Sequence, residues 1–111
     1  MTKRKNPCKP LEGAAQRRVV ILGLPPVDAL DVIGPAEVFT FANYLRSGER
    51  APYVLELVCA GPELYIESET GIGFRGHKTL DQESRSNRPI DTLIVTTGAT
   101  PIDRKRPAIP S

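Results

Sequence analysis

The stretch that decides the fold is residues 17–45, which read RRVVILGLPPVDALDVIGPAEVFTFANYL. The apolar run VVIL at residues 19–22 is typical of a short strand that is covered on both faces. Pro25 and Pro26 end this run, and apolar residues then recur at helical spacing as far as Leu45. The pattern predicts a strand over residues 18–23 and a helix over residues 28–46, which together are half of a β-α-β unit.

The ends of this helix carry recognisable signals. Asp28 can cap the helix, and Asp31 lies three residues later, which is the spacing of a capping box. Pro35 either starts a second helical segment or kinks one longer helix. Gly48 is the expected stop.

The rest of the chain continues the α/β pattern. Residues 53–59, YVLELVC, and residues 91–96, DTLIVT, are predicted to be buried strands. Between them, residues 64–68 and 70–76 are typical of a hairpin, and residues 80–89 of a polar loop with at most one helical turn. We therefore expect a mainly parallel α/β sheet with one main helix and an edge hairpin, in which the strands at 18–23, 53–59 and 91–96 are neighbours.

A parallel sheet needs helices on both of its faces, and only one strong helix is visible in this sequence. The next crossover helix should begin after Ala99, but residues 100–111 hold three prolines and a basic cluster and show no periodicity. The uncovered face of the sheet is expected to leave apolar surface exposed, which favours self-association.

Length and charge limit the classes of function. The 111 residues make at most one domain, which we assign to residues 17–99, between a disordered leader at 1–16 and an irregular tail at 100–111. The formal net charge of +2 comes from the two ends, because residues 17–99 hold eight basic and eleven acidic residues. Basic ends either contact nucleic acid or a membrane or are simply solvated, and we favour the solvated interpretation.

Cysteine use and hydropathy indicate a cytoplasmic protein. Cys8 and Cys59 do not make a disulfide framework, and free thiols suit a reducing compartment. No apolar run approaches the roughly 20 residues that cross a bilayer. The basic start of the chain is not followed by the apolar segment of a secretory signal, so we expect no membrane contact.

Asp31 is the strongest candidate for chemistry. A carboxylate after the first strand lies near the carboxyl edge of the sheet, where open α/β sheets bind ligands, and it can hydrogen-bond a nucleophile or a ligand. The alternative is an acid at a helix N-terminus that interacts favourably with the helix dipole.

The other candidates favour structural interpretations. Cys59 follows a strand, but the chain then leads into another strand and not into the helix that a nucleophile elbow needs, so we expect a buried structural cysteine. His77, the only histidine, is expected at the surface. Gly71, Gly73 and Gly76 match G-x-G-x-x-G after a hairpin, which is the wrong context for a dinucleotide site. No cluster has metal-ligand spacing, so we expect neither a metal nor a cofactor.

A family resemblance rests on three segments. The run VVILGLPPVDALDVIGPAEVFTFAN at residues 19–43, the segment YVLELVCAG and the later DTLIVTTGA resemble the PfpI/ThiJ family of class I glutamine-amidotransferase-like domains, and DVIGPAEVF at residues 31–39 is the specific part of the first run. Over residues 17–99 the chain is similar to the N-terminal domain of GlxA-type AraC-class transcriptional regulators. The resemblance implies a flavodoxin-like fold that is commonly dimeric and binds a small molecule.

The resemblance also implies which residues matter. Enzymes of the family pair a cysteine at a nucleophile elbow with an acid after the first strand, and Asp31 falls at that acid position. Glu37 belongs to the same run but lies one and a half turns further on and faces elsewhere. The elbow cysteine and the AraC-type helix-turn-helix half have no counterpart in this sequence. The chain therefore resembles a C-terminally truncated member, whose last residues look like either a shifted reading frame or the end of a truncated gene.

Three functions are compatible with this resemblance. The first is a truncated sensor domain of an AraC-class regulator, which binds a small effector or forms a homodimer, without catalysis and without direct DNA binding by this chain. The second is a fragment of a cysteine-dependent isonitrile hydratase or glyoxalase-like enzyme that lacks its nucleophile. The third is a gene fragment without function.

Overall fold

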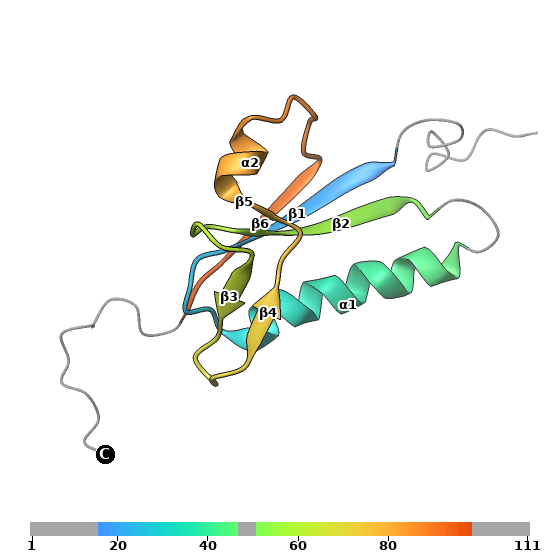
Figure 1. Cartoon of the computed structure of the whole chain (residues 1–111). Helices are drawn as coiled ribbons and strands as arrows, with labels where there is room; N and C mark the ends of the chain where they lie inside the picture. Colours follow the sequence, from blue (N-terminus) through green and yellow to red (C-terminus); the bar gives the residue numbers. More distant parts are fainter. Residues whose placement is uncertain (1–15, 47–50, 99–111) are drawn as a thin grey trace, which may run out of the picture.

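Four parallel strands form the centre of the fold (Figure 1). The computed structural model describes residues 16–46 and 51–98. The strands of the sheet are β1 (Arg17–Gly23), β2 (Tyr53–Cys59), β5 (Lys78–Thr79) and β6 (Thr92–Thr96), in the order β5-β2-β1-β6. β1 pairs in parallel with β2 and β6, which confirms the predicted neighbours, and β5 pairs with β2 on its other side.

The long helix α1 (Ala29–Leu45) covers one face of this sheet (Figure 1). It runs through Pro35 as one helix, so Pro35 does not start a second segment. The Asn43 side chain donates to the carbonyl of Tyr53 at 3.1 Å and accepts from the Tyr53 N–H at 3.0 Å. The ring of Phe39 packs edge-on against that of Tyr53, so the end of α1 is fixed to the start of β2.

The start of α1 differs from the prediction. Asp28 is the residue before the helix, but its side chain accepts no hydrogen bond there. The prediction of a capping box formed by Asp28 and Asp31 is therefore wrong, although Asp28 does stand at the N-cap position. A tertiary contact holds the backbone instead, since the N–H of Asp28 donates to the carbonyl of Thr97 at 3.2 Å.

The predicted hairpin forms, but it is not at the edge of the main sheet. β3 (Tyr65–Glu67) and β4 (Gly73–Arg75) make a separate two-stranded antiparallel sheet. The edge beside β2 is taken by His77 and β5 instead. The N–H of His77 donates to the carbonyl of Leu57 at 2.8 Å, and the Nδ1 atom of His77 accepts from the N–H of Leu57 at 2.8 Å.

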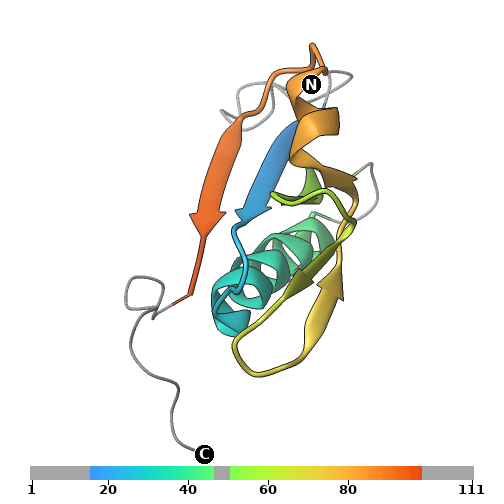
Figure 2. The ribbon, with the colours of Figure 1, turned by 60° about the vertical axis from the view of Figure 1, so that its left-hand side comes forward.

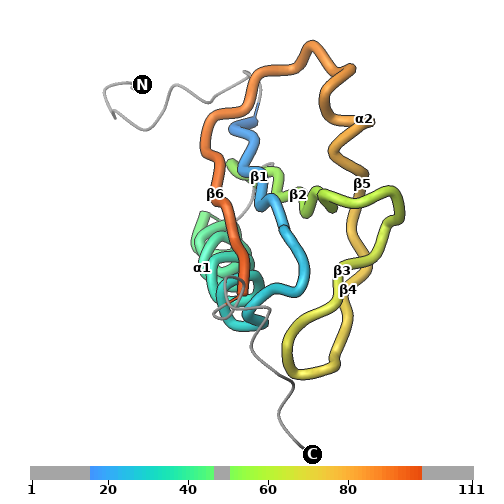
Figure 3. Tube along the Cα trace, turned by 90° about the vertical axis from the view of Figure 1, so that its left-hand side faces the viewer, coloured from blue at the N-terminus to red at the C-terminus, as the bar shows by residue number. Residues whose placement is uncertain are grey.

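A small apolar core joins the hairpin to the end of β2 and the start of α1. Its four buried members are Val27, Val32, Cys59 and Ile66. Leu57 packs against this core from β2. The hairpin consequently lies on the same side of the sheet as α1, beside the first turns of that helix (Figure 3).

A short helix, α2 (Leu80–Ser84), lies on the opposite side of the sheet from α1 (Figure 3). The sequence allowed one helical turn here but did not predict β5. Thr79 and Gln82 make a capping box, in which the Thr79 hydroxyl accepts from the Gln82 N–H at 3.1 Å and the Gln82 side chain accepts from the Thr79 N–H at 2.9 Å. This T-x-x-Q spacing is a signal that the sequence does contain.

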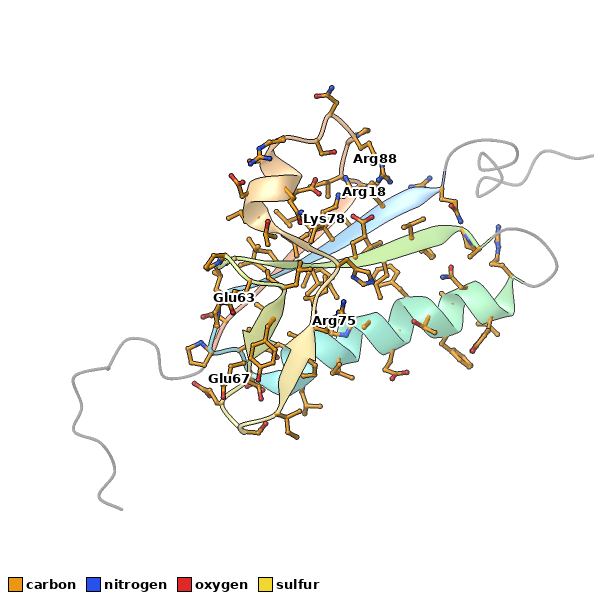
Figure 4. All side chains as sticks on the ribbon, viewed as in Figure 1. Arg18, Glu63, Glu67, Arg75, Lys78 and Arg88 are labelled. Atoms are coloured by element: carbon orange, nitrogen blue, oxygen red, sulfur yellow. The ribbon has the colours of Figure 1, made fainter. Side chains whose placement is uncertain are left out.

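Arg18 in β1 is a buried arginine that ties α2 to the sheet (Figure 4). Its guanidinium contacts Glu56 of β2 at 2.6 Å and Glu83 of α2 at 3.0 Å. The hydrogen bond from Arg18 lowers the pKa of Glu83. Burial raises the pKa of Glu56, but the hydrogen bond and the charge of Arg18, together with the charges of Lys78 and Arg88, leave that pKa lowered.

Some sequence-based expectations concern residues outside those that the structure describes. These are the leader apart from Gln16, Cys8, the helix stop at Gly48 and the tail at residues 100–111. Among the described residues, neither helix is long and apolar enough to cross a membrane.

Replacing Glu83 tests whether its ionised carboxylate stabilises the folded protein. We expect Glu83→Gln to lower the free energy of unfolding by about 1–2 kcal/mol at neutral pH, because a charge-assisted hydrogen bond is lost. The pKa of Glu83 is lowered in the folded state. The ionised carboxylate of Glu83 therefore adds to the free energy of unfolding above the ordinary pKa of 4.5, and this contribution is lost as the pH falls through the lowered pKa. Urea unfolding at a series of pH values should show the two proteins converging in acid.

The matched control is Glu63→Gln, which neutralises an exposed glutamate in the bend between β2 and β3. It should change the free energy of unfolding by less than about 0.5 kcal/mol. A gap between wild type and Glu83→Gln that stays constant into acid would show that the charge of Glu83 contributes nothing.

Candidate functional site

The carboxyl ends of β1 and β6 mark the place where this topology is expected to bind a ligand. The chain leaves β1 through α1 toward β2 on one side, and it returns to β6 on the other side of β1. Such a reversal is a topological switch point, and open α/β sheets bind ligands in the crevice that it creates. Figure 2 shows β1 and β6 side by side, pointing toward this edge of the sheet.

Main-chain contacts close this crevice. The N–H of Leu24 donates to the carbonyl of Thr96 at 3.0 Å, and the N–H of Asp28 donates to the carbonyl of Thr97 at 3.2 Å. Gly98 is buried, and a Cβ at this position would clash with the carbonyl oxygen of Pro26. The loops after β1 and β6 are therefore paired with each other, which leaves the rim around them as the surface that a ligand can reach.

The turn of the hairpin forms another wall of the same edge. Two main-chain hydrogen bonds fix Val27 to the hairpin. The Val27 N–H donates to the carbonyl of Glu67 at 3.0 Å, and the Val27 carbonyl accepts from the Glu69 N–H at 2.9 Å. The hydroxyls of Ser68 and Thr70 lie 2.6 Å apart inside the turn. Gly71 has a φ of +97°, a left-handed conformation that favours glycine.

Asp31 lies on this rim, in the first turn of α1, and it is exposed. Its N–H donates to the carbonyl of Asp28 at 3.0 Å. Glu67 is also exposed and comes to the same edge from the hairpin, so the rim is acidic. No group of three or more His, Cys, Asp or Glu residues within the described ranges can hold a metal ion. The role of Asp31 as the family acid stays a prediction.

Cys59 is a buried structural residue, as the sequence predicts. It is 0% exposed within the apolar core, and burial raises the pKa of its thiol, although the N–H of Gly76 offsets part of this rise. Gly76 lies so close that a Cβ there would clash with the Sγ atom of Cys59. The thiol is therefore both neutral and inaccessible to solvent, whereas an activated nucleophile is an accessible thiolate.

His77 has a structural role that sequence reasoning missed. The residue is exposed, as predicted, but its ring completes the ladder beside β2 through the 2.8 Å hydrogen bond from Leu57. Nothing in the sequence signals this pairing, because it depends on how the hairpin returns the chain to the sheet. Gly73 is also structural, since it lies under the ring of Tyr65.

Known proteins give no direct guide to this edge of the sheet. Comparison with models of protein families, with curated proteins and with solved structures finds no match. The resemblance of residues 17–99 to the PfpI/ThiJ family therefore stays a hypothesis that rests on the sequence segments quoted above.

Two glycine substitutions test whether the crevice is closed. We expect Gly98→Ala to lower the free energy of unfolding by about 1–3 kcal/mol, because the added methyl group meets a main-chain carbonyl that cannot rotate away. Gly61→Ala is the matched control, since a Cβ at residue 61 meets no atom within 4 Å. Urea unfolding measures both variants, and an equal effect of the two substitutions would contradict a closed crevice.

The burial of Cys59 predicts its reactivity. In a Cys8→Ser background, we expect a disulfide reagent to label Cys59 in the native protein orders of magnitude more slowly than in urea. The raised pKa reinforces this protection, because a smaller fraction of the thiol is ionised at neutral pH. Rapid labelling of the native protein would show that Cys59 is accessible.

Proposed function

We propose that this chain is a non-catalytic sensor domain of the PfpI/ThiJ type, from an AraC-class transcriptional regulator, and that it forms a homodimer through α1. The proposal includes a flavodoxin-like fold, a cytoplasmic location and a small effector at the carboxyl rim of the sheet. The observation that carries it is the outer surface of α1, which exposes five large apolar side chains around Glu37 although it faces away from the sheet.

This outer surface carries five exposed apolar side chains, which we call the outer stripe, and Glu37 lies on the same side of the helix. The members of the outer stripe are Leu30, Val38, Phe41, Tyr44 and Leu45. They recur at intervals that keep them on one side of the helix. A helix that is apolar on both sides is normally buried on both sides, and the sheet covers only one of them here.

A second copy of the same helix is the occupant that fits this stripe best. The 17 residues of α1 extend for about 25 Å, so two such stripes can face each other over most of the helix. Apolar patches larger than a few hundred Å² on a domain surface usually mark interaction sites. An isologous pair would cover both stripes at once.

The absence of catalysis is supported by the chemistry of the site. Cys59 is the only cysteine among the described residues, and its thiol is neutral and buried. Asp31 therefore has no nucleophile to activate there, which speaks against the alternative of a cysteine-dependent hydratase or glyoxalase-like enzyme. The net negative charge of residues 17–99 likewise does not favour direct DNA binding by this part of the chain.

The test is a charge placed in the outer stripe. Phe41 is 61% exposed, so Phe41→Lys should leave the fold intact and reduce the self-association constant by at least about tenfold, because it buries a charge in an apolar contact. Thr40→Lys adds the same charge on the same helix, about 100° around the axis, and should have a small effect. Sedimentation velocity over a range of concentrations measures both variants.

Two results would contradict the proposal. One is equal self-association of Phe41→Lys and Thr40→Lys, which would remove α1 from the contact. The other is turnover of an isonitrile or a 2-oxoaldehyde that is lost in Cys59→Ser, which would make the chain an enzyme.

A further inference from the structure

The strand β6 is an edge strand without the usual protection. It pairs with β1 on one side, and its other side has no strand partner among the described residues. Its sequence, TLIVT, holds neither charge nor proline, which are the devices that normally prevent an edge from pairing. Leu93 is 53% and Val95 is 57% exposed, although both are large apolar residues.

The hydrogen-bonding groups on this edge belong to the same two residues. The carbonyl of Thr96 accepts from the N–H of Leu24, so Thr96 directs its main-chain groups toward β1. In a parallel ladder this direction alternates along the strand. The N–H and carbonyl groups of Leu93 and Val95 therefore point outward, beyond the sheet.

The strand is nearly symmetrical about its central residue. If two copies of TLIVT run antiparallel about Ile94, Leu93 of one copy lies opposite Val95 of the other, and Thr92 lies opposite Thr96. The outward main-chain groups of Leu93 and Val95 then face each other as hydrogen-bonded pairs. A second copy of this strand therefore matches the edge in both hydrogen bonding and side-chain type.

We infer that a second copy of this chain pairs with the outer edge of β6 in antiparallel orientation, so that the two four-stranded sheets continue as one. The contact spans only the five residues of each β6, so it buries well under the roughly 1,600 Å² of a standard stable interface. The pairing is therefore weak and depends on protein concentration.

This inference does not rest on the proposed function, because it uses a different surface from the outer stripe of α1. Two isologous surfaces on one chain would join copies into open rows, whereas either surface alone stops at a dimer. The two surfaces can therefore be separated by blocking one at a time.

The experiment compares two lysines that replace similarly exposed β-branched residues. Val95→Lys places a charge opposite the apolar Leu93 of the other copy and two like charges on a diagonal across the two-fold axis, so self-association through β6 should fall at least about tenfold. Ile72→Lys is the matched control, because Ile72 is 62% exposed in the hairpin turn and makes its hydrogen bonds through main-chain atoms. Sedimentation velocity measures both variants with and without Phe41→Lys.

In the Phe41→Lys background, the β6 contact is the only one of the two surfaces that is left intact. There we expect concentration-dependent dimers with Ile72→Lys and monomers with Val95→Lys. Equal mass distributions for the two lysine variants would overturn the inference. Coverage of the edge by residues 99–111 of the same chain would give that equal result.

A cysteine at the two-fold axis tests the register. In a Cys8→Ser background, Ile94→Cys brings two thiols to a site where opposite Cα atoms are about 4.5 Å apart, which a disulfide can bridge. We expect mild oxidation to link Ile94→Cys into covalent dimers and to leave Ile72→Cys mostly monomeric. Equal rates of linkage would overturn the antiparallel register about Ile94.

Discussion

The burial of one charge in the central strand constrains the rest of the structure. Arg18 lies in β1, and its guanidinium reaches β2 through Glu56 and α2 through Glu83. It also donates to the carbonyl of Arg88 at 3.1 Å, while its own N–H donates to the Asp91 carboxylate at 2.7 Å. A buried guanidinium that loses a partner is costly, so these elements are held together. Its Nε atom is the one side-chain polar atom that is buried without a hydrogen bond among the described residues.

This constraint determines the geometry of the carboxyl edge. With the start of β6 held against β1, the two strands end together, and the loops that follow them pair through Leu24 and Asp28. Gly98 then lies against the carbonyl of Pro26, and the switch-point crevice is closed. The acidic rim, including Asp31, remains available, while Cys59 is sealed beneath the hairpin.

The same layout leaves apolar surface uncovered on two sides. The sheet covers only one side of α1, and β6 ends the sheet with uncharged residues. A parallel sheet of this kind is normally enclosed by helices, and α2, with five residues, covers little of its face. Pairing with further copies is the simplest way to remove such surface from water.

Local patterns in the sequence determined the strands, the long helix and the parallel arrangement, because apolar runs and helical spacing act over a few residues. They also determined that Cys59 is structural, since a strand and not a helix follows it. Only the tertiary structure decided that the hairpin leaves the sheet edge to His77 and β5, that Thr97 and not a capping box holds Asp28, and that Gly98 closes the crevice. These outcomes depend on main-chain groups from distant segments, and hydrogen bonds between such groups leave no periodic signal in the residues that make them.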